Sequence, residues 1–150
     1  MRDLAAWPPM LRKLLESVPH ELLTRRSAAG GFALVEHVWH LADLEVEGYG
    51  VRLRRLLDET NPSLPDFQGD IIAAERDYIR LPLAAGLDRF EQARMKNAVL
   101  IASASEEERL REGQQEGVGT VTFARVAQMM DEHDREHAIE VMALVVEIGG

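Results

Sequence analysis

Apolar residues recur every three or four positions over several long stretches of the chain, and this spacing is typical of amphipathic helices. The first stretch starts at Pro8-Pro9, which suit a first helical turn, and ends at Pro19. Its apolar stripe is Met10, Leu11, Leu14, Leu15 and Val18. A glycine-rich break, Ser27 to Gly31, then separates it from the second stretch.

The second stretch predicts a long helix from about Phe32 to Glu59. Its stripe is Leu34, Val38, Leu41, Leu44 (or Glu45), Tyr49, Leu53, Leu56 and Leu57. Gly48 and Gly50 lie inside it, and each weakens a helix by about 1 kcal/mol relative to alanine. We therefore expect a kink or a close helix crossing at these glycines.

Three further helices are expected downstream. A short one covers Ile71 to Arg80, a third long one runs from Leu83 to about Ser103, and the last runs to about Glu147. The third long helix has the stripe Leu87, Phe90, Met95 (or Arg94), Ala98 and Ile101. Ser105, which can cap a helix with its side-chain oxygen, marks an acidic turn after the third long helix. A flexible connector over residues 113–119 follows, and Thr120 or Thr122 can cap the last helix.

No stretch shows the sustained alternation expected of strands, and residues 118–123 are β-branched but short. The predicted fold class is therefore all-α: a four-helix bundle with an extra short helix before the third long helix. With 150 residues, 46% of them hydrophobic, the chain fits a single helical-bundle domain over residues 1–150.

Charge and composition narrow the function. The net charge is -9, which disfavours nucleic-acid binding, and the basic cluster Arg52-Leu53-Arg54-Arg55 is interpreted as a solvated helix face. The absence of cysteine excludes disulfides, thiolate metal sites and a cysteine nucleophile. We see no membrane-length apolar run and no signal peptide, so we expect a cytoplasmic protein without membrane association.

Four of the five histidines form two pairs on predicted long helices. His133 and His137 are four residues apart, and His37 and His40 are three apart, so each pair shares a helix face. Facing helices would gather these imidazoles with carboxylates, for which Asp43, Glu47 and Glu140 are candidates. Single helical histidines are more often surface or core residues than ligands, and His20 and His37 are interpreted in that way.

Two known metal-site motifs do not fit the sequence. Residues 133–137 spell H-x-x-E-H, an inverted zinc-protease signature, but only 13 residues follow His137 and a distant third ligand is missing. A di-iron carboxylate bundle requires Glu-x-x-His on two helices, and this motif does not occur in the chain.

The chain resembles the DinB-like family of small bacterial four-helix-bundle metalloproteins. Residues 38–45 (VWHLADLE) are similar to the family's HLAD-E segment, and residues 90–100 to its third helix. Two further features agree with the family's pattern in order and spacing: the Gly-rich connector that leads to a capping Thr, and the pair His133-x3-His137. The resemblance implies that His40, His133 and His137 hold one divalent metal ion, either Zn, Ni or Fe, and that the protein forms a homodimer.

Some members of the family look like metal-dependent thiol transferases that act with low-molecular-weight thiols. Our leading hypothesis is a metal-dependent thiol transferase or hydrolase acting on a small-molecule substrate, with Glu140 and Asp43 near the metal as possible bases. The alternatives are a non-enzymatic metal- or ligand-binding protein and an interaction module.

The sequence departs from the family's pattern at two places. Residues 31–33 (GFA) stand where the family often has Trp and a Ser or Thr cap, and Glu140 stands where it often has Gln.

Overall fold

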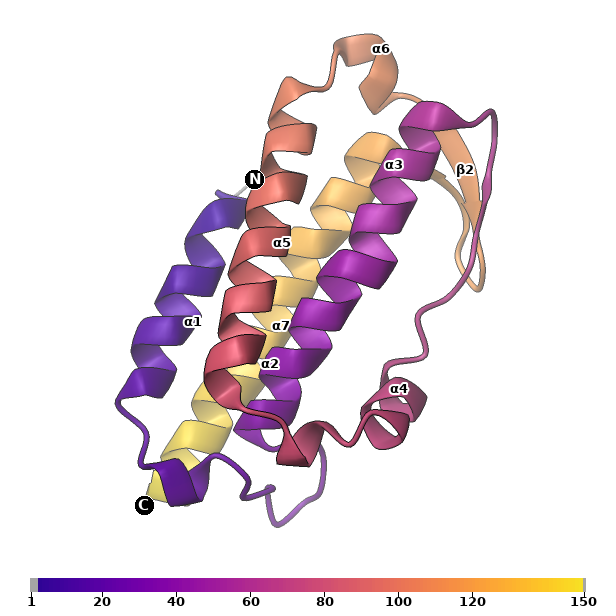
Figure 1. The fold of residues 1–150 in the computed structure, drawn as a ribbon. Coiled ribbons are helices and arrows are strands. Elements are labelled where there is room, and N and C mark those ends of the chain that lie inside the picture. Colours follow the sequence, from indigo (N-terminus) through magenta and orange to yellow (C-terminus); the bar gives the residue numbers. More distant parts are fainter. Residues whose placement is uncertain (1–2, 150) are drawn as a thin grey trace.

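The computed structural model describes residues 3–149, and these residues form a four-helix bundle (Figure 1). Its long members are α1 (Trp7–Glu16), α5 (Leu83–Ser103), α7 (Phe123–Gly149) and a continuous rod. The rod consists of α2 (Leu34–Asp43), the π-helix η3 (Leu44–Tyr49) and α3 (Gly50–Asp58). The all-α bundle prediction is confirmed, and the bounds of α5 agree with the predicted bounds.

Two apolar clusters fill the bundle. One joins α1, α2, α5 and the end of α7, and the other joins η3, α3 and the start of α7. Most predicted stripe positions are buried, but Met10 and Met95 are 63% and 57% exposed. Of the two alternatives predicted for the α5 stripe, Met95 or Arg94, Arg94 is the buried one, and its charge is matched by carboxylates inside the bundle.

A π-helical turn and a close crossing occur where Gly48 and Gly50 interrupt the second predicted helix. A Cβ added at Gly50 would lie 2.9 Å from the Glu45 carbonyl oxygen and 3.3 Å from Asn97 Oδ1 on α5. The missing side chain therefore lets the rod approach α5 closely. The π-helix widens the rod by one residue per turn, which is typical of functional regions.

The expectation of no strands was wrong. Three short strands, β1 (Ser63–Leu64), β2 (Glu112–Gln115) and β3 (Gly119–Thr122), form a sheet in the order β1-β2-β3. The β1 and β2 strands pair in parallel, and β2 and β3 pair antiparallel. The inward positions of β2 are Gly113 and Gln115. Neither residue has an apolar side chain, and therefore β2 does not show the alternation of apolar and polar residues by which a strand is recognised in a sequence.

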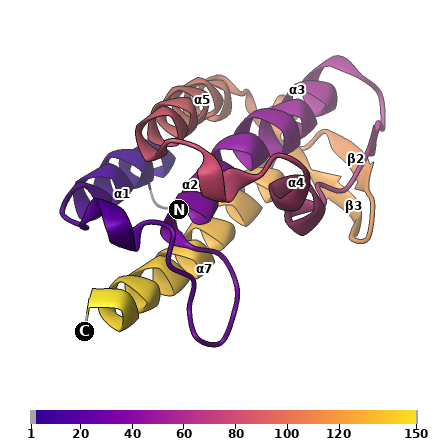
Figure 2. The ribbon, with the colours of Figure 1, turned by 60° about the horizontal axis from the view of Figure 1, so that its bottom comes forward.

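Between the rod and α5, the chain forms α4 (Gly69–Glu75) and the 3-10 turn η4 (Tyr78–Arg80). The predicted helix Ile71–Arg80 is interrupted because Asp77 adopts a left-handed conformation with φ of 53°. Figure 2 shows α4 beside the rod, on the same side as β2 and β3.

Caps explain where the remaining helices begin. Ser105 Oγ accepts the Glu108 N–H at the start of α6 (Glu106–Arg109), as predicted. Of the two threonines proposed for α7, Thr122 is the cap, because its Oγ1 accepts the Arg125 N–H. No helix within residues 3–149 is both long and apolar enough to cross a membrane.

The basic cluster at residues 52–55 is only partly a solvated face. Arg52 is 5% exposed, lies over the Tyr49 ring and donates to the Pro65 carbonyl oxygen at 3.4 Å. Arg54 is exposed, as predicted. Arg52 is buried because its guanidinium packs between the Tyr49 ring and the loop after α3, contacts between elements that the helical repeat alone does not reveal.

Candidate metal centre

Three histidines from two helices converge inside the bundle. His40 comes from α2, and His133 and His137 come from α7, which packs against α2. The Nε2 atoms of His133 and His137 are 3.1 Å apart, and the His40 ring centre is 5.0 Å from that of His137. One nitrogen from each ring lies within 4.8 Å of the others, so the three could hold a metal ion.

Burial keeps these imidazoles neutral. Loss of water contact, reinforced by the neighbouring histidines, lowers the pKa of His40 to about 4 and the pKa of His133 to about 3. Burial also lowers the pKa of His137. Neutral imidazole is the form that binds metal ions, so the site needs little proton release at neutral pH before binding one.

The geometry fits a divalent ion. Two nitrogens bound to one ion at 2.0–2.1 Å lie roughly 2.9–3.4 Å apart for bond angles between 90° and tetrahedral, and the Nε2 separation falls in that range. His40 Nδ1 is buried without a hydrogen-bond partner among the described residues. Leaving such an atom unpaired costs free energy, which a ligand or ion nearby would offset. Three neutral imidazoles suit Zn, Ni or Fe.

His37, which the sequence interpretation treated as a surface or core residue, lies inside the bundle beside the three histidines. It is 3% exposed, and its Nδ1 lies 3.0 Å from Nδ1 of His137. A second possible metal group combines His37, His137 and Glu140. The signal that could have found His37 is its spacing of three from His40, which places both rings on one face of α2.

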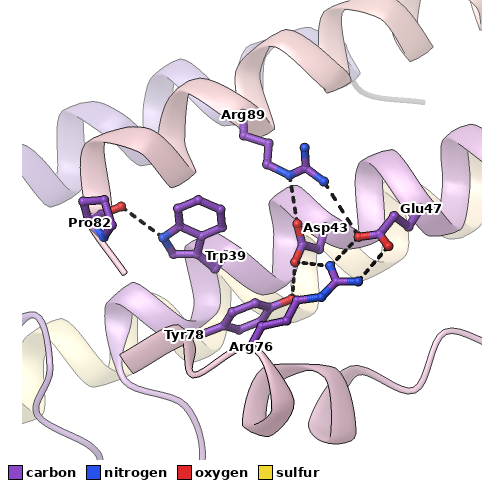
Figure 3. Close-up of polar contacts among 7 residues, drawn as sticks. All are labelled: Trp39, Asp43, Glu47, Arg76, Tyr78, Pro82 and Arg89. Atoms are coloured by element: carbon purple, nitrogen blue, oxygen red, sulfur yellow. Dashed lines mark hydrogen bonds and ion pairs between the residues drawn. The ribbon is translucent and has the colours of Figure 1, made fainter. Parts of the chain in front are cut away.

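The two proposed bases lie in different surroundings. Glu140 has a side chain 61% exposed, and its Oε2 is 4.0 Å from His37 Nε2. Asp43 is buried and its carboxylate accepts hydrogen bonds from Arg76, Tyr78 and Arg89 (Figure 3). Glu47 accepts a hydrogen bond from the same Arg76. The hydrogen bonds of the Asp43 carboxylate thus connect the rod to the α4–η4 segment and to α5, and among the described residues none of them goes to a histidine.

An open cavity leads to the histidines. Its volume is about 530 Å³, and its lining consists of Gly31, Phe32, His40, Asp70, His137 and Glu140. The Phe32 ring centre lies 5.4 Å from that of His40, so an aromatic wall faces the imidazoles. The cavity lining therefore includes two of the three imidazoles, His40 and His137, together with the acidic residues Asp70 and Glu140.

A family comparison agrees with this arrangement. The model of the DinB superfamily matches residues 4–141, which is most of the chain. The chain belongs to the DinB superfamily. The matched range contains α2 and the part of α7 that carries both histidines, so the candidate centre lies wholly within the DinB-like region.

A solved structure has the same bundle fold. It is described as "YfiT from Bacillus subtilis is a probable metal-dependent hydrolase with an unusual four-helix bundle topology". The two chains are 18% identical with a TM-score of 0.89, and the match covers 97% of this chain and 83% of YfiT. No curated protein sequence matches this chain significantly. At this identity, the likeness establishes the fold.

Proposed function

We propose that this DinB superfamily member binds one divalent metal ion through His40, His133 and His137 and is a metal-dependent hydrolase or thiol transferase. The observation that carries the proposal is the convergence of three neutral imidazoles, His40, His133 and His137, two of which (His40 and His137) also line an open cavity. Catalytic metal sites characteristically have three protein ligands and an open position. The description of YfiT as a probable metal-dependent hydrolase supports the same class.

The substrate is a small molecule. A cavity of about 530 Å³ lies in the size range of ordinary small-molecule sites. The Phe32 ring provides an apolar wall, and the exposed carboxylate of Glu140 is available to accept a proton at the cavity mouth. A metal ion bound there would make a water molecule or a low-molecular-weight thiol more acidic and so more nucleophilic.

Metal analysis of the purified protein, before and after soaking with Zn²⁺, Ni²⁺ or Fe²⁺, tests the proposal together with a screen of ester and thiol substrates. We expect about one ion per chain and metal-dependent turnover. His133→Ala should abolish both, because two imidazoles hold an ion poorly. His20→Ala is the matched control, since His20 is exposed and outside the cluster.

The outcomes separate the candidate functions. A wild-type protein that takes up no metal would overturn the proposal. Metal uptake without turnover of any substrate would instead favour a non-enzymatic metal- or ligand-binding protein. Metal uptake by His133→Ala equal to that of wild type and of His20→Ala would mean that the ion binds elsewhere and would overturn the proposed ligands.

A further inference from the structure

His137 uses both of its ring nitrogens at once. Its Nε2 lies 3.1 Å from His133 Nε2, and its Nδ1 lies 3.0 Å from His37 Nδ1. His37 is buried, and the Phe32 ring packs edge-on against it with 5.5 Å between ring centres. The His37 ring is thus fixed in place behind His137, away from His133.

Metal binding would settle the positions of the protons on these rings. A neutral imidazole carries one proton, and a nitrogen bound to a metal has none. If His137 binds through Nε2, its proton is on Nδ1 and is donated to His37 Nδ1. His37 must then be unprotonated at Nδ1 and carry its own proton on Nε2, which faces Glu140 Oε2 at 4.0 Å.

We propose that His37 is a positioning residue that fixes the orientation and the tautomer of His137 for metal binding. The inference rests on the proposed metal site and adds a role for a residue outside the three ligands. Metal-binding histidines usually donate their second N–H to a partner that orients the ring and raises its basicity. Here the acceptor is a second neutral imidazole, and Glu140 lies at the far end of the chain of contacts.

A role for His37 as a ligand is less consistent with the contacts. An ion placed between His37 and His137 would occupy Nδ1 of His137. The His137 ring could then bind this ion through Nδ1 and the proposed metal ion through Nε2 only by losing its last proton. A neutral acceptor avoids that cost, and a buried N–H facing an acceptor nitrogen is a satisfied hydrogen bond.

Tautomers can be read directly in the wild-type protein. Long-range ¹H–¹⁵N correlation spectra of ¹⁵N-histidine-labelled protein loaded with Zn²⁺ should show His137 protonated at Nδ1 and His37 protonated at Nε2. Assignment uses single histidine variants. A zinc-loaded wild-type protein with His37 protonated at Nδ1, or with neither His37 nitrogen protonated, would overturn the proposal.

Zinc affinity provides the second readout, measured by competition with a chelating indicator. His37→Leu removes the acceptor and should weaken zinc binding about 10–100-fold while one ion per chain is retained. His20→Leu makes the same substitution at an exposed histidine and should leave the affinity unchanged. Equal affinity of His37→Leu and wild type would contradict the positioning role.

Stoichiometry distinguishes the remaining cases. Two ions bound to wild type and one to His37→Leu would identify His37 as a ligand of a second ion and would overturn the positioning role. Failure of wild type to bind zinc would instead overturn the proposed function itself. Tight zinc binding that is unaffected by His37→Leu would overturn only the inference about His37.

Discussion

At the residue scale, Gly69 determines how closely α4 approaches the candidate metal centre. A Cβ added at this position would lie 2.7 Å from Cε1 and 2.9 Å from Nδ1 of His40. Real Cβ contacts are not this short, so any side chain at residue 69 must displace the His40 ring or α4. Glycine is therefore required here for space next to a proposed metal ligand.

The substitution Gly69→Ala should weaken zinc binding by about tenfold, the scale of effect that follows when the support of a metal ligand is disturbed. The metal-free protein should also lose some thermal stability, because the added methyl group displaces the His40 ring or α4. Zinc competition and thermal unfolding measure the two effects. Gly149→Ala is the control, since nothing lies within 4 Å of a Cβ at that position. An unchanged zinc affinity in Gly69→Ala would show that His40 is not a ligand or that α4 yields freely.

At the element scale, charged groups rather than apolar packing hold α4 to the bundle. Ala73 is its one buried residue, whereas Asp43 accepts hydrogen bonds from Arg76 and Tyr78, which follow α4 directly. Arg89 of α5 donates to the same carboxylate at 2.8 Å (Figure 3). Asp43 thus joins α2, α5 and the α4–η4 segment.

Asp43→Asn should loosen α4. An amide has one acceptor oxygen in place of two and turns an N–H group toward the arginines, so buried donors lose partners at a cost of about 1–3 kcal/mol. Hydrogen exchange should accelerate in residues 69–80 while the centre of α5 stays protected. Asp88→Asn is the matched control, because Asp88 forms an exposed ion pair with Arg12. Uniform acceleration along the chain would contradict the local role.

Elements differed in how far the sequence predicted them. The bounds of α5 follow from a proline before it and a stripe along it, both of which are local signals. The break at Asp77 and the strand β2 gave no local signal. Asp77 adopts a conformation that asparagine, aspartate and glycine only sometimes adopt, and β2 is made by pairing with β1 and β3.

At the scale of the whole molecule, one arginine connects four segments. The Arg94 guanidinium on α5 donates to Asp134 on α7, to Glu45 in η3 and to the Leu4 carbonyl oxygen, at 2.7–2.9 Å. Burial alone would lower the pKa of Arg94, but the two carboxylates raise it above its usual value. The ion therefore stays charged inside the bundle, 1% exposed.

Arg94→Met should destabilise the metal-free protein by about 3–5 kcal/mol in urea unfolding, because it leaves Glu45 and Asp134 buried without a counter-ion. Arg125→Met removes an arginine from the exposed pair with Glu132 and should cost no more than about 1 kcal/mol. If both variants were equally stable, the buried network would contribute no net stability.

The sequence by itself determined the long helices and the shared faces of the histidine pairs, because these depend on residues close together in the chain. It also indicated the family, through motifs whose order and spacing agree along most of the chain. The spacings of His133 with His137 and of His37 with His40 fixed which rings point together along each helix. The resemblance then named His40, His133 and His137 as one group. Asp43 and Glu140 were also predicted as candidate bases, but the spacing of residues along a helix does not predict which side chains surround them.

Only the tertiary structure decided which partners these side chains have. The packing of α2 against α7 brings His37 onto His137, and the return of the chain through α4 encloses Asp43 among arginines. Both outcomes depend on the rotation of one helix against another, and the π-helix adds a residue to a turn of the rod. The 3.6-residue repeat of a helix predicts neither the rotation between two helices nor the extra residue of a π-helical turn. Contacts between distant elements are therefore visible only in the folded chain.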